Sequence, residues 1–314
     1  MPEPRSSHPE VAAIVVTYHP DPAALDALIG ALAPQVGHLV VVDNGSSTAE
    51  LGRCRASIEA AGGMLVELGA NRGIATAQNI GCQRAVAAGG VTRLLLMDQD
   101  SVPAADMVGR LAAALDEGPG PDGLPVAAVG AVATDGRDGE PPFVYASRRW
   151  GPRRVELPDT DGARVQAGFL IASGCMIEAS ALASVGPMAD DMFIDHVDLE
   201  WCVRARRAGW AVYAVVGATM SHSLGDEPAH LPGRRRSVHV QSTSRNYYMV
   251  RNTVRLMRWR GLPLGWRLGY VLYLGKYLAY YSLVAGPRRV RVPLLARGLV
   301  DGMLGRTGPM PARR

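Results

Sequence analysis

Two carboxylates spaced by one residue follow an apolar run in the stretch Leu94–Ser101 (LLLMDQDS). The run Leu94–Met97 has no alternation of apolar and polar residues, which predicts a strand buried on both faces. Asp98 and Asp100 then stand at its carboxyl end, where open α/β sheets bind ligands. Their charges repel unless a cation lies between them, and oxygen ligands suit Mg²⁺ or Mn²⁺. The segment therefore predicts a metal that holds a phosphorylated substrate, and a polar turn with two solvated carboxylates is the alternative.

A second dense group of charged residues lies in the stretch 193–209 (FIDHVDLEWCVRARRAG). Most of it predicts a helix that ends at its final glycine, with Asp195 and Asp198 near the start. The helix dipole favours carboxylates at that end. These residues are therefore candidates for acid–base chemistry, and capping together with a Glu200–Arg204 pair one turn apart is the alternative.

Other polar residues follow strand-like segments. Asp43 ends the run 38–43 and could bind a ribose hydroxyl or a base N–H, although it could equally cap its own turn. Arg72 and Gly73 lie in a strand-to-helix turn where an arginine could meet a phosphate at a helix N-terminus. This turn lacks the spacings of the known phosphate loops. His222 is expected in a turn after the last strand, where it matters only if it points back at Asp100.

The segments that must position these residues alternate between strand and helix patterns. The predicted strands are 11–18, 38–43, 64–68, 94–97 and 126–132, and the predicted helices are 22–32, one after Gly73, and 104–115. The first helix begins at Asp21-Pro22, an N-cap followed by a proline at the first helical position. Strands and helices that alternate with short links are the pattern of a doubly wound α/β layer.

The chain after residue 133 is less regular. Residues 134–162 are rich in Gly, Pro, Asp and Arg and predict a long loop with a short strand at 143–146. Loops of this length are usually functional or disordered. A strand is predicted at 165–176 with a break at Ser173-Gly174, where a bulge or close approach of a ligand would explain the glycine. A further strand is predicted at 211–216.

The composition is that of a globular protein, with 314 residues, 48% hydrophobic and 20% charged. The four cysteines are scattered without metal-binding or redox spacing, which indicates reduced thiols in a cytosol. Residues 1–10 contain no apolar secretory segment. No stretch offers eighteen uninterrupted apolar residues, so a membrane-spanning helix is not expected.

The charge is unevenly distributed along the chain. Residues 245–314 hold 14 of the 33 basic residues and one of the 29 acidic residues, Asp301, which gives this part a formal charge of +13 and the rest −9. A basic block indicates an anionic partner such as a membrane surface or nucleic acid. Tyr, Leu and Arg on the predicted helices 268–285 and 292–304 suit a membrane–water interface. Packing of these helices on the α/β body is the alternative.

Taken together, these segments resemble glycosyltransferase family 2, which has the GT-A fold, and are most similar to its bacterial rhamnosyltransferase branch. The resemblance covers most of residues 11–252. It is carried by VAAIVVTY (11–18), VVDNGSS (41–47), NRGIATAQNIG (71–81), LLLMDQDS (94–101), FIDHVDLEWCVRARRAGW (193–210), His222 and RNYYMVRN (245–252).

The resemblance implies an α/β GT-A domain in residues 1–240, a Rossmann-like mixed sheet flanked by helices, and a helical, basic, membrane-associating extension in residues 241–314. It implies an inverting, divalent-metal-dependent glycosyltransferase on the inner face of the bacterial cytoplasmic membrane. The expected reaction moves L-rhamnose from dTDP-L-rhamnose to a hydroxyl of a lipid-linked or cell-surface polysaccharide. Transfer of galactofuranose or another sugar from UDP is the alternative.

The resemblance also assigns residue roles. Asp198 matches the general base. The expected donor-binding residues are Thr17, Asp43, Asn71, Arg72, Gly73, Asn79, Asp98, Gln99, Asp100 and Arg204. The residues expected on the acceptor and diphosphate side are Asp195, Glu200, Trp201, Arg245, Tyr248 and Arg251. The expected ligands of Mg²⁺ or Mn²⁺ are Asp100 and His222, with Asp98 as a further candidate.

Two other classes of protein share parts of this pattern. A haloacid-dehalogenase-like phosphatase would use Asp98 as nucleophile and Asp100 as acid/base, but its motif ends the first strand, whereas three strand-like segments precede it here. Such an enzyme also needs a downstream lysine, and the only one, Lys276, lies in the aromatic tail. A non-catalytic nucleotide-binding or membrane-binding module is the second rival. No nucleic-acid partner is expected, and the sequence leaves a homo-oligomer open.

Overall fold

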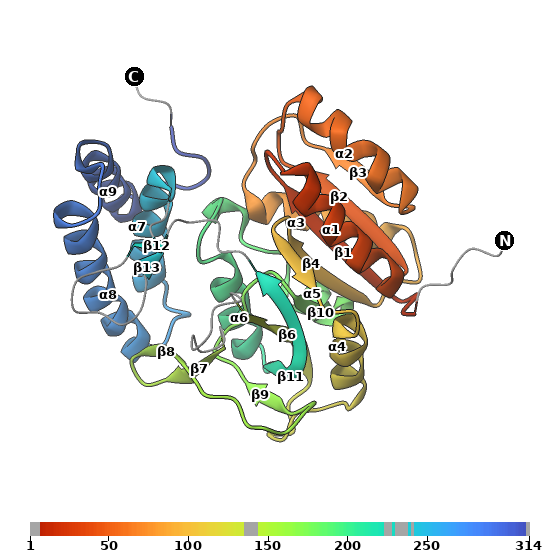
Figure 1. The fold of residues 1–314 in the computed structure, drawn as a ribbon. Coiled ribbons are helices and arrows are strands. Elements are labelled where there is room, and N and C mark those ends of the chain that lie inside the picture. Colours follow the sequence, from red (N-terminus) through yellow and green to blue (C-terminus); the bar gives the residue numbers. More distant parts are fainter. Residues whose placement is uncertain (1–6, 135–143, 223–227, 230–237, 240–241, 312–314) are drawn as a thin grey trace.

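A mixed sheet forms the centre of the chain, of which the computed structural model describes residues 7–134, 144–222, 228–229, 238–239 and 242–311 (Figure 1). The predicted apolar runs form its first strands, β1 (Val11–Thr17), β2 (His38–Asp43), β3 (Met64–Glu67) and β4 (Arg93–Asp98). They lie parallel in the order β3-β2-β1-β4. Thr17 is in register with Asp43, and Val16 with Asp98, so these strands end at one edge.

The second half of the sheet continues from β4 in the order β10-β6-β11-β5, with β9 also on β11. Its strands are β5 (Ser101–Pro103), β6 (Val126–Thr134), β9 (Arg164–Gln166), β10 (Cys175–Glu178) and β11 (Ala211–His222). Strand β10 is antiparallel to both neighbours, and β6 and β11 are parallel to each other. Two small hairpins lie outside the sheet, β7 (Tyr145–Arg148) with β8 (Gly151–Arg154), and β12 (Pro228–Ala229) with β13 (Val238–His239).

Helices cover both faces of the sheet. One face carries α1 (Pro22–Leu32), α2 (Thr48–Ala60) and α4 (Met107–Asp116), and the other carries α3 (Ile74–Ala87), α5 (Ala179–Val185) and α6 (Val197–Arg207). Short 3₁₀ helices, η1 (Ala33–Gln35) and η2 (Asp190–Met192), follow α1 and precede α6. Because side chains alternate along a strand, Val11, Ala13 and Val15 of β1 face the first layer and Ala12 and Ile14 the second. The predicted α/β fold with a mixed sheet flanked by helices is confirmed.

Local signals in the sequence explain where several helices begin. Asp21 caps α1 by accepting a hydrogen bond of 2.9 Å from the backbone N–H of Ala24. Ser47 and Glu50 form a capping box at the start of α2. Gly81 lets α3 lie close on the sheet, because a Cβ at this position would overlap the side chain of Ile14.

Several predicted boundaries were wrong, and three of them concern elements beside the candidate site. The apolar run 165–176 forms two strands rather than one, because residues 167–174 leave the sheet and Gly174 takes a left-handed turn with φ +75°. The helix expected from residue 104 begins at Met107, since residues 101–103 pair with β11 as the short strand β5. The strand expected to end at residue 216 continues to His222, past a register shift near Gly217, so this histidine ends a strand and does not lie in a turn.

Three helices complete the chain, α7 (Thr243–Arg258), α8 (Leu264–Leu283) and α9 (Arg288–Met303). Figure 1 shows them grouped at one side of the sheet, next to the β7–β8 hairpin. They have a small core of their own around Val250, Tyr277 and Leu295. However, Leu256 and Trp266 belong to the same buried cluster as α3 and α6. The three helices therefore share the core of the α/β body. Among the residues that the structure describes, no helix is long and apolar enough to cross a membrane.

Candidate active site

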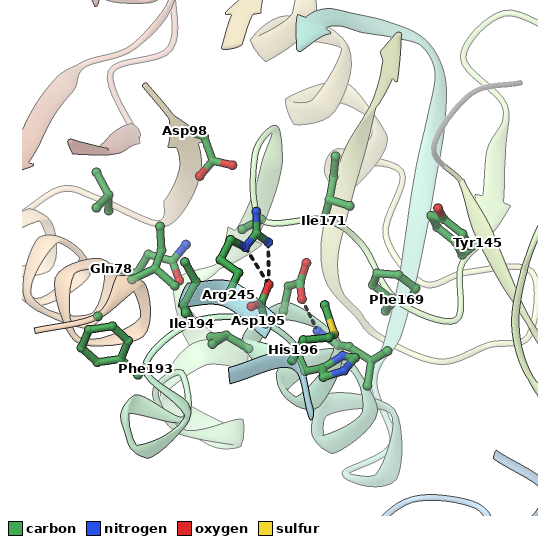
Figure 2. A pocket seen from close by; sticks show the side chains of 18 of the residues that line it. Gln78, Asp98, Tyr145, Phe169, Ile171, Phe193, Ile194, Asp195, His196 and Arg245 are labelled. Atoms are coloured by element: carbon green, nitrogen blue, oxygen red, sulfur yellow. Dashed lines mark hydrogen bonds and ion pairs between the residues drawn. The ribbon is translucent and has the colours of Figure 1, made fainter. Parts of the chain in front are cut away.

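A pocket of about 870 Å³ opens at the carboxyl ends of β1 and β4 (Figure 2). Its other walls are the start of α6, the β7–β8 hairpin, the N-terminal part of α7 and residues 269–273 of α8. The predicted site residues that line it are Thr17, Asn71, Gly73, Asp98, Gln99, Asp100, Asp195, Asp198 and Arg245. The structure thus brings together residues from both dense motifs of the sequence.

The turn that carries Asp98 and Asp100 is held by hydrogen bonds on two sides. The side chain of Gln99 accepts from the backbone N–H of Tyr18 at 2.8 Å and donates to the backbone carbonyl of the same residue at 3.2 Å. The hydroxyl of Ser173 accepts from the backbone N–H of Asp98 at 3.1 Å and donates to the hydroxyl of Ser101 at 2.7 Å. The predicted break at Ser173 is therefore a support for this turn.

The pair Asp98 and Asp100 fits a divalent cation. Both carboxylates line the pocket directly after β4, and carboxylate oxygens are the donors that Mg²⁺ and Mn²⁺ prefer. No group of three or more His, Cys, Asp or Glu side chains that could hold a metal exists within the described ranges. Mg²⁺ is usually bound by one or two carboxylates together with substrate phosphates, and the two carboxylates of this turn fit such an ion.

His222 is the last residue of β11. Its Cα is the cross-strand partner of Ser101, the residue after Asp100, in the pairing of β11 with β5. The backbone therefore brings this histidine beside the predicted metal-binding turn, although its side chain lies outside what the structure describes.

Asp43 binds its own turn. Its carboxylate, which is 1% exposed, accepts from the hydroxyl of Thr17 at 3.1 Å and from the backbone N–H groups of Gly45 and Ser46 at 3.0 and 2.8 Å. It does not line the pocket, but the next residue, Asn44, does. Asp43 therefore caps its own turn, which is one of the two roles that the sequence predicted for it.

The turn before α3 reaches the pocket through its backbone. Asn71 accepts from the backbone N–H of Gly73 at 3.0 Å, and the side chain of Asn44 binds the N–H of Arg72 at 2.8 Å. Gly73 has φ +87°, and a Cβ there would strike Phe193. The backbone N–H of Ile74 donates to the Phe193 carbonyl at 2.7 Å, so this turn touches the loop before α6. The Arg72 side chain is exposed and does not line the pocket.

Asp198 lies in the first turn of α6 and faces the pocket. Its carboxylate accepts a hydrogen bond of 2.8 Å from the backbone N–H of Leu199. Burial, with added repulsion from Asp98 and Asp195, raises the pKa of Asp198 to about 6. A carboxylate with this pKa is mostly ionised at neutral pH and is a stronger base than an ordinary aspartate.

The loop before Asp198 has a strained backbone. Phe193, Asp195 and His196 have φ values of +67°, +66° and +64°, which residues other than glycine rarely adopt. Asn252 of α7 holds this loop by donating to the carbonyls of Met192, Ile194 and Asp195 at 3.0, 2.8 and 3.0 Å. Strain that neighbouring residues maintain is common at functional sites.

Asp195 and Arg245 form an ion pair in the pocket wall (Figure 2). The guanidinium of Arg245 contacts Oδ1 of Asp195 through Nη2 at 2.5 Å and through Nε at 3.1 Å. The Asp195 side chain is 1% exposed, and its Oδ2 is buried with no hydrogen-bond partner among the described residues. One oxygen of a buried carboxylate is therefore left to accept a hydrogen bond.

His196 connects the same loop to α7. The hydroxyl of Thr253 donates to the Met249 carbonyl at 2.7 Å, so it accepts from Nε2–H of His196 at 2.9 Å. Burial lowers the pKa of His196 to about 4, so the ring is neutral at neutral pH. Its role in this structure is to position the loop.

Other predicted site residues lie outside the pocket and make contacts within the protein. Asn79 exchanges two hydrogen bonds with the backbone of Met188 at 2.8 and 2.9 Å. Arg204 pairs with Glu200 and binds the carbonyls of Val185 and Pro187, each at 2.7 Å. These contacts brace α3 and α6 beneath the site.

Three aromatic or basic residues from the same prediction are also parts of the framework. The buried Trp201 donates through Nε1 to the Gly186 carbonyl at 2.9 Å. Tyr248 stacks on Phe193 with ring centroids 4.8 Å apart. Arg251 is fully buried and donates to the Met192 carbonyl at 2.7 Å. Tyr248 and Arg251 thus contact the loop around Asp195, whereas Trp201 binds the end of α5, and none of the three lines the pocket.

Sequence reasoning did not identify an aromatic wall of the pocket. It consists of Tyr145, Trp150, Phe169, Tyr270 and Tyr273. Tyr145 and Trp150 come from the β7–β8 hairpin, within the loop 134–162 that was expected to be functional. Phe169 was expected in a strand, and Tyr270 and Tyr273 of α8 were expected in a helix at a membrane–water interface. Figure 2 shows Tyr145 and Phe169 on one side of the pocket and Gln78 and Phe193 on the other, with Asp98, Arg245 and Asp195 between them.

The mixed sheet and its flanking helices form the GT-A fold of glycosyltransferases. The model of glycosyl transferase family 2 matches residues 13–182. The chain therefore belongs to glycosyltransferase family 2. A dTDP-rhamnosyl transferase, RfbF of Shigella flexneri, is 30% identical over 302 residues, which are 95% of this chain and 97% of the relative.

Solved structures with the same fold are much more distant in sequence. GalNAc-T7 with UDP, GalNAc and Mn²⁺ aligns with a TM-score of 0.58 at 13% identity over 94% of this chain and 56% of that one. Residues 1–349 of TarS from S. aureus align with a TM-score of 0.53 at 12% identity over 93% of this chain and 80% of that one. At these identities the likeness concerns the fold alone.

Proposed function

We propose that this glycosyltransferase moves L-rhamnose from dTDP-L-rhamnose to a hydroxyl of a lipid-linked or cell-surface polysaccharide, with inversion at the anomeric carbon. The observation that carries the proposal is that Asp198 and the Asp98–Asp100 pair face one pocket, close enough for the charge of Asp98 to raise the pKa of Asp198. The similarity to a dTDP-rhamnosyl transferase supports L-rhamnose as the sugar and dTDP as the nucleotide of the donor.

Asp198 is the proposed general base. It removes the proton from the acceptor hydroxyl as the oxygen attacks the anomeric carbon from the face opposite the diphosphate. Its pKa of about 6 supports this role, because the base is ionised at neutral pH and its affinity for a proton is raised. Asp195 and Arg245, which line the same pocket, are proposed to act on the acceptor and diphosphate side.

The donor is proposed to lie along the ends of β1 and β4. Thr17, Asn71 and Gly73 line that side of the pocket together with the 98–100 turn. Asp98 and Asp100, with His222 at the neighbouring strand end, would hold Mg²⁺ or Mn²⁺. Such an ion screens the charge of the nucleoside diphosphate leaving group. Asp43 is proposed to support the base or ribose through the turn that it caps.

The C-terminal helices are proposed to place the enzyme on the inner face of the cytoplasmic membrane. One face of α8 is buried at positions 266, 270, 274, 277 and 281. The opposite face exposes large apolar side chains, Leu264 at 66%, Leu268 at 49%, Val271 at 55%, Leu272 at 69% and Leu283 at 69%. Successive residues of an α-helix are rotated by about 100°, which places Arg267 and Lys276 on the two sides of this stripe. An apolar stripe with basic edges suits a surface of anionic lipid.

Release of nucleoside diphosphate from a panel of donors tests the proposed reaction. The panel is dTDP-L-rhamnose, UDP-galactofuranose, UDP-glucose and GDP-mannose, each with and without Mn²⁺. Slow, metal-dependent hydrolysis of dTDP-L-rhamnose alone is the expected result. Cleavage of UDP-galactofuranose instead would keep the mechanism and replace the sugar. A chain that neither cleaves any donor nor binds dTDP with Mn²⁺ would refute the proposed function.

A further inference from the structure

Tyr145 and Phe169 of the aromatic wall lie across the pocket from Gln78 and Phe193 (Figure 2). Tyr145 and Phe169 stack with ring centroids 5.0 Å apart and planes 22° from parallel. Trp150, at the turn of the β7–β8 hairpin, is 48% exposed although it is large and apolar. Aromatic side chains that face a polar pocket are suited to stack on a flat, partly apolar ring.

The wall combines these faces with polar groups. The buried Oδ2 of Asp195 has no partner among the described residues, and Arg153 and Arg245 line the same pocket. Asp195 and Tyr273 of the aromatic wall line the same pocket. A buried acceptor oxygen beside aromatic faces is complementary to a ligand with hydroxyls on its edge and C–H groups on its face.

The hairpin that carries Trp150 is held on α8 by close contact. A Cβ at Gly265 would overlap the Arg149 carbonyl, and a Cβ at Gly269 would overlap the Trp150 carbonyl. Trp266, between these glycines, donates through Nε1 to the Arg148 carbonyl at 2.7 Å. The two glycines and this hydrogen bond therefore fix the hairpin turn on one side of α8.

We propose that Tyr145, Phe169 and Trp150, with Asp195, form the subsite that binds a sugar ring of the acceptor. The inference rests on the proposed function, and it specifies that the group recognised next to Asp198 is a carbohydrate, stacked on the hairpin, rather than the lipid or its phosphate. The pocket volume of about 870 Å³ leaves space for such a ring beside a nucleotide sugar.

Saturation-transfer NMR on the full chain with dTDP and Mn²⁺ tests this subsite. The probes are propyl glycosides of rhamnose, glucose, galactose and N-acetylglucosamine, at millimolar concentration. At least one should bind, Trp150→Ala should weaken its binding about tenfold, and Trp150→Phe should keep most of it because a stacking face remains. The affinity for dTDP should be unchanged in both variants.

A matched pair of glycine variants tests the support of the hairpin. Gly269→Ala should displace the hairpin and weaken glycoside binding, whereas Gly275→Ala in the same helix should not, because nothing lies within 4 Å of its Cβ position. If Gly269→Ala does not fold, Trp150→Ala still decides the question.

Three outcomes would overturn the inference. They are binding of none of the glycosides, equal binding by wild type and Trp150→Ala, and a loss of dTDP affinity in Trp150→Ala that matches the loss of glycoside affinity. The last outcome would show that the aromatic wall binds the nucleobase of the donor and not a sugar of the acceptor. If dTDP-L-rhamnose is hydrolysed by a protein that binds no glycoside, the proposed function stands and only this subsite fails.

Discussion

Arg245 and Asp195 are joined at 2.5 Å by an ion pair that connects α7 to the strained loop before Asp198. The two residues are 50 positions apart in the chain, and both line the pocket. The first helix of the C-terminal region is thus part of the wall of the candidate active site.

Arg245→Ala should destabilise the protein, because it leaves the carboxylate of Asp195 buried without its cation. A broken buried pair costs about 3–5 kcal/mol, and the 38% exposure of the arginine reduces this to roughly 1–3 kcal/mol. Urea unfolding measures the change. The double variant Asp195→Asn with Arg245→Ala should recover part of the loss, and a double variant less stable than Arg245→Ala would contradict this account.

Asp198→Asn should abolish transfer while donor binding remains. Loss of a general base typically lowers kcat by about 10²–10⁴-fold, and the neutral amide cannot take the acceptor proton. The measurements are turnover with the natural acceptor or an active glycoside and calorimetric binding of dTDP with Mn²⁺. Asp190→Asn, an exposed neighbour outside the pocket, is the control. Turnover near the wild-type rate in Asp198→Asn would remove this residue as the base.

The rate of transfer should fall as the pH drops through about 6, because protonation removes the base. The same raised pKa makes the folded protein less stable as the pH rises, whereas the rate of transfer increases. The folded state binds a proton at Asp198 more tightly than the unfolded state, whose pKa is near 3.8, so the free energy of unfolding decreases as the pH rises from about 4 to 6. Asp198→Asn should therefore raise Tm at pH 7 and leave it unchanged at pH 3.5. A variant with equal or lower Tm at pH 7 would show that the carboxylate is not penalised by burial.

Removal of the metal should abolish donor cleavage, and added Mn²⁺ should restore it. Asp100→Ala should lose the metal-dependent part of dTDP affinity, because one of the two carboxylates of the 98–100 turn is missing. Calorimetry measures the affinity for dTDP in the presence of EDTA or of Mn²⁺. Asp26→Ala on the exposed side of α1 is the control. Equal dTDP affinity with and without Mn²⁺ in the wild type would refute the metal role.

The double variant Leu268→Gln with Leu272→Gln should reduce sedimentation with vesicles of phosphatidylglycerol and phosphatidylcholine by roughly tenfold or more. Both side chains belong to the exposed stripe of α8. Val86→Gln, an equally exposed site on α3, should have no effect. Truncation at residue 240 is unsuitable, because it would remove Leu256 and Trp266 from the shared core. Unchanged sedimentation of the double variant would show that the stripe does not meet lipid.

Local patterns predicted much of the fold and the centre of the site. The β2 strand was predicted with the bounds it has, because an uninterrupted apolar run is followed at once by a turn-forming sequence. Asp98 and Asp198 were identified separately by their motifs, each at the end of an element. Their common pocket depends on which strand ends and helix starts meet, which the order of the sheet determines.

Contacts distant in the sequence account for what was missed. The stretch 167–174 is as apolar as a strand, yet Phe169 and Ile171 line the pocket instead of pairing in the sheet. Asn252 lies in a recognised motif, but its binding to three carbonyls about sixty residues earlier leaves no local pattern. Asn79 lies in another such motif, and its amide clamps Met188 rather than facing the pocket.

The residues that hold the 192–196 loop come late in the chain, so during protein synthesis the loop can be held only late. A nascent chain that has left the ribosome as far as residue 240 already contains the donor-side residues and Asp198. The partners of the loop come last, namely Arg245, Asn252 and Gly308, whose N–H binds the Asp191 carbonyl at 2.7 Å. The contacts that hold this loop are therefore complete only after the chain as far as Gly308 has left the ribosome. A product terminated near residue 240 would carry Asp98, Asp100 and Asp198 without the contacts from Arg245 and Asn252 that hold the loop before Asp198.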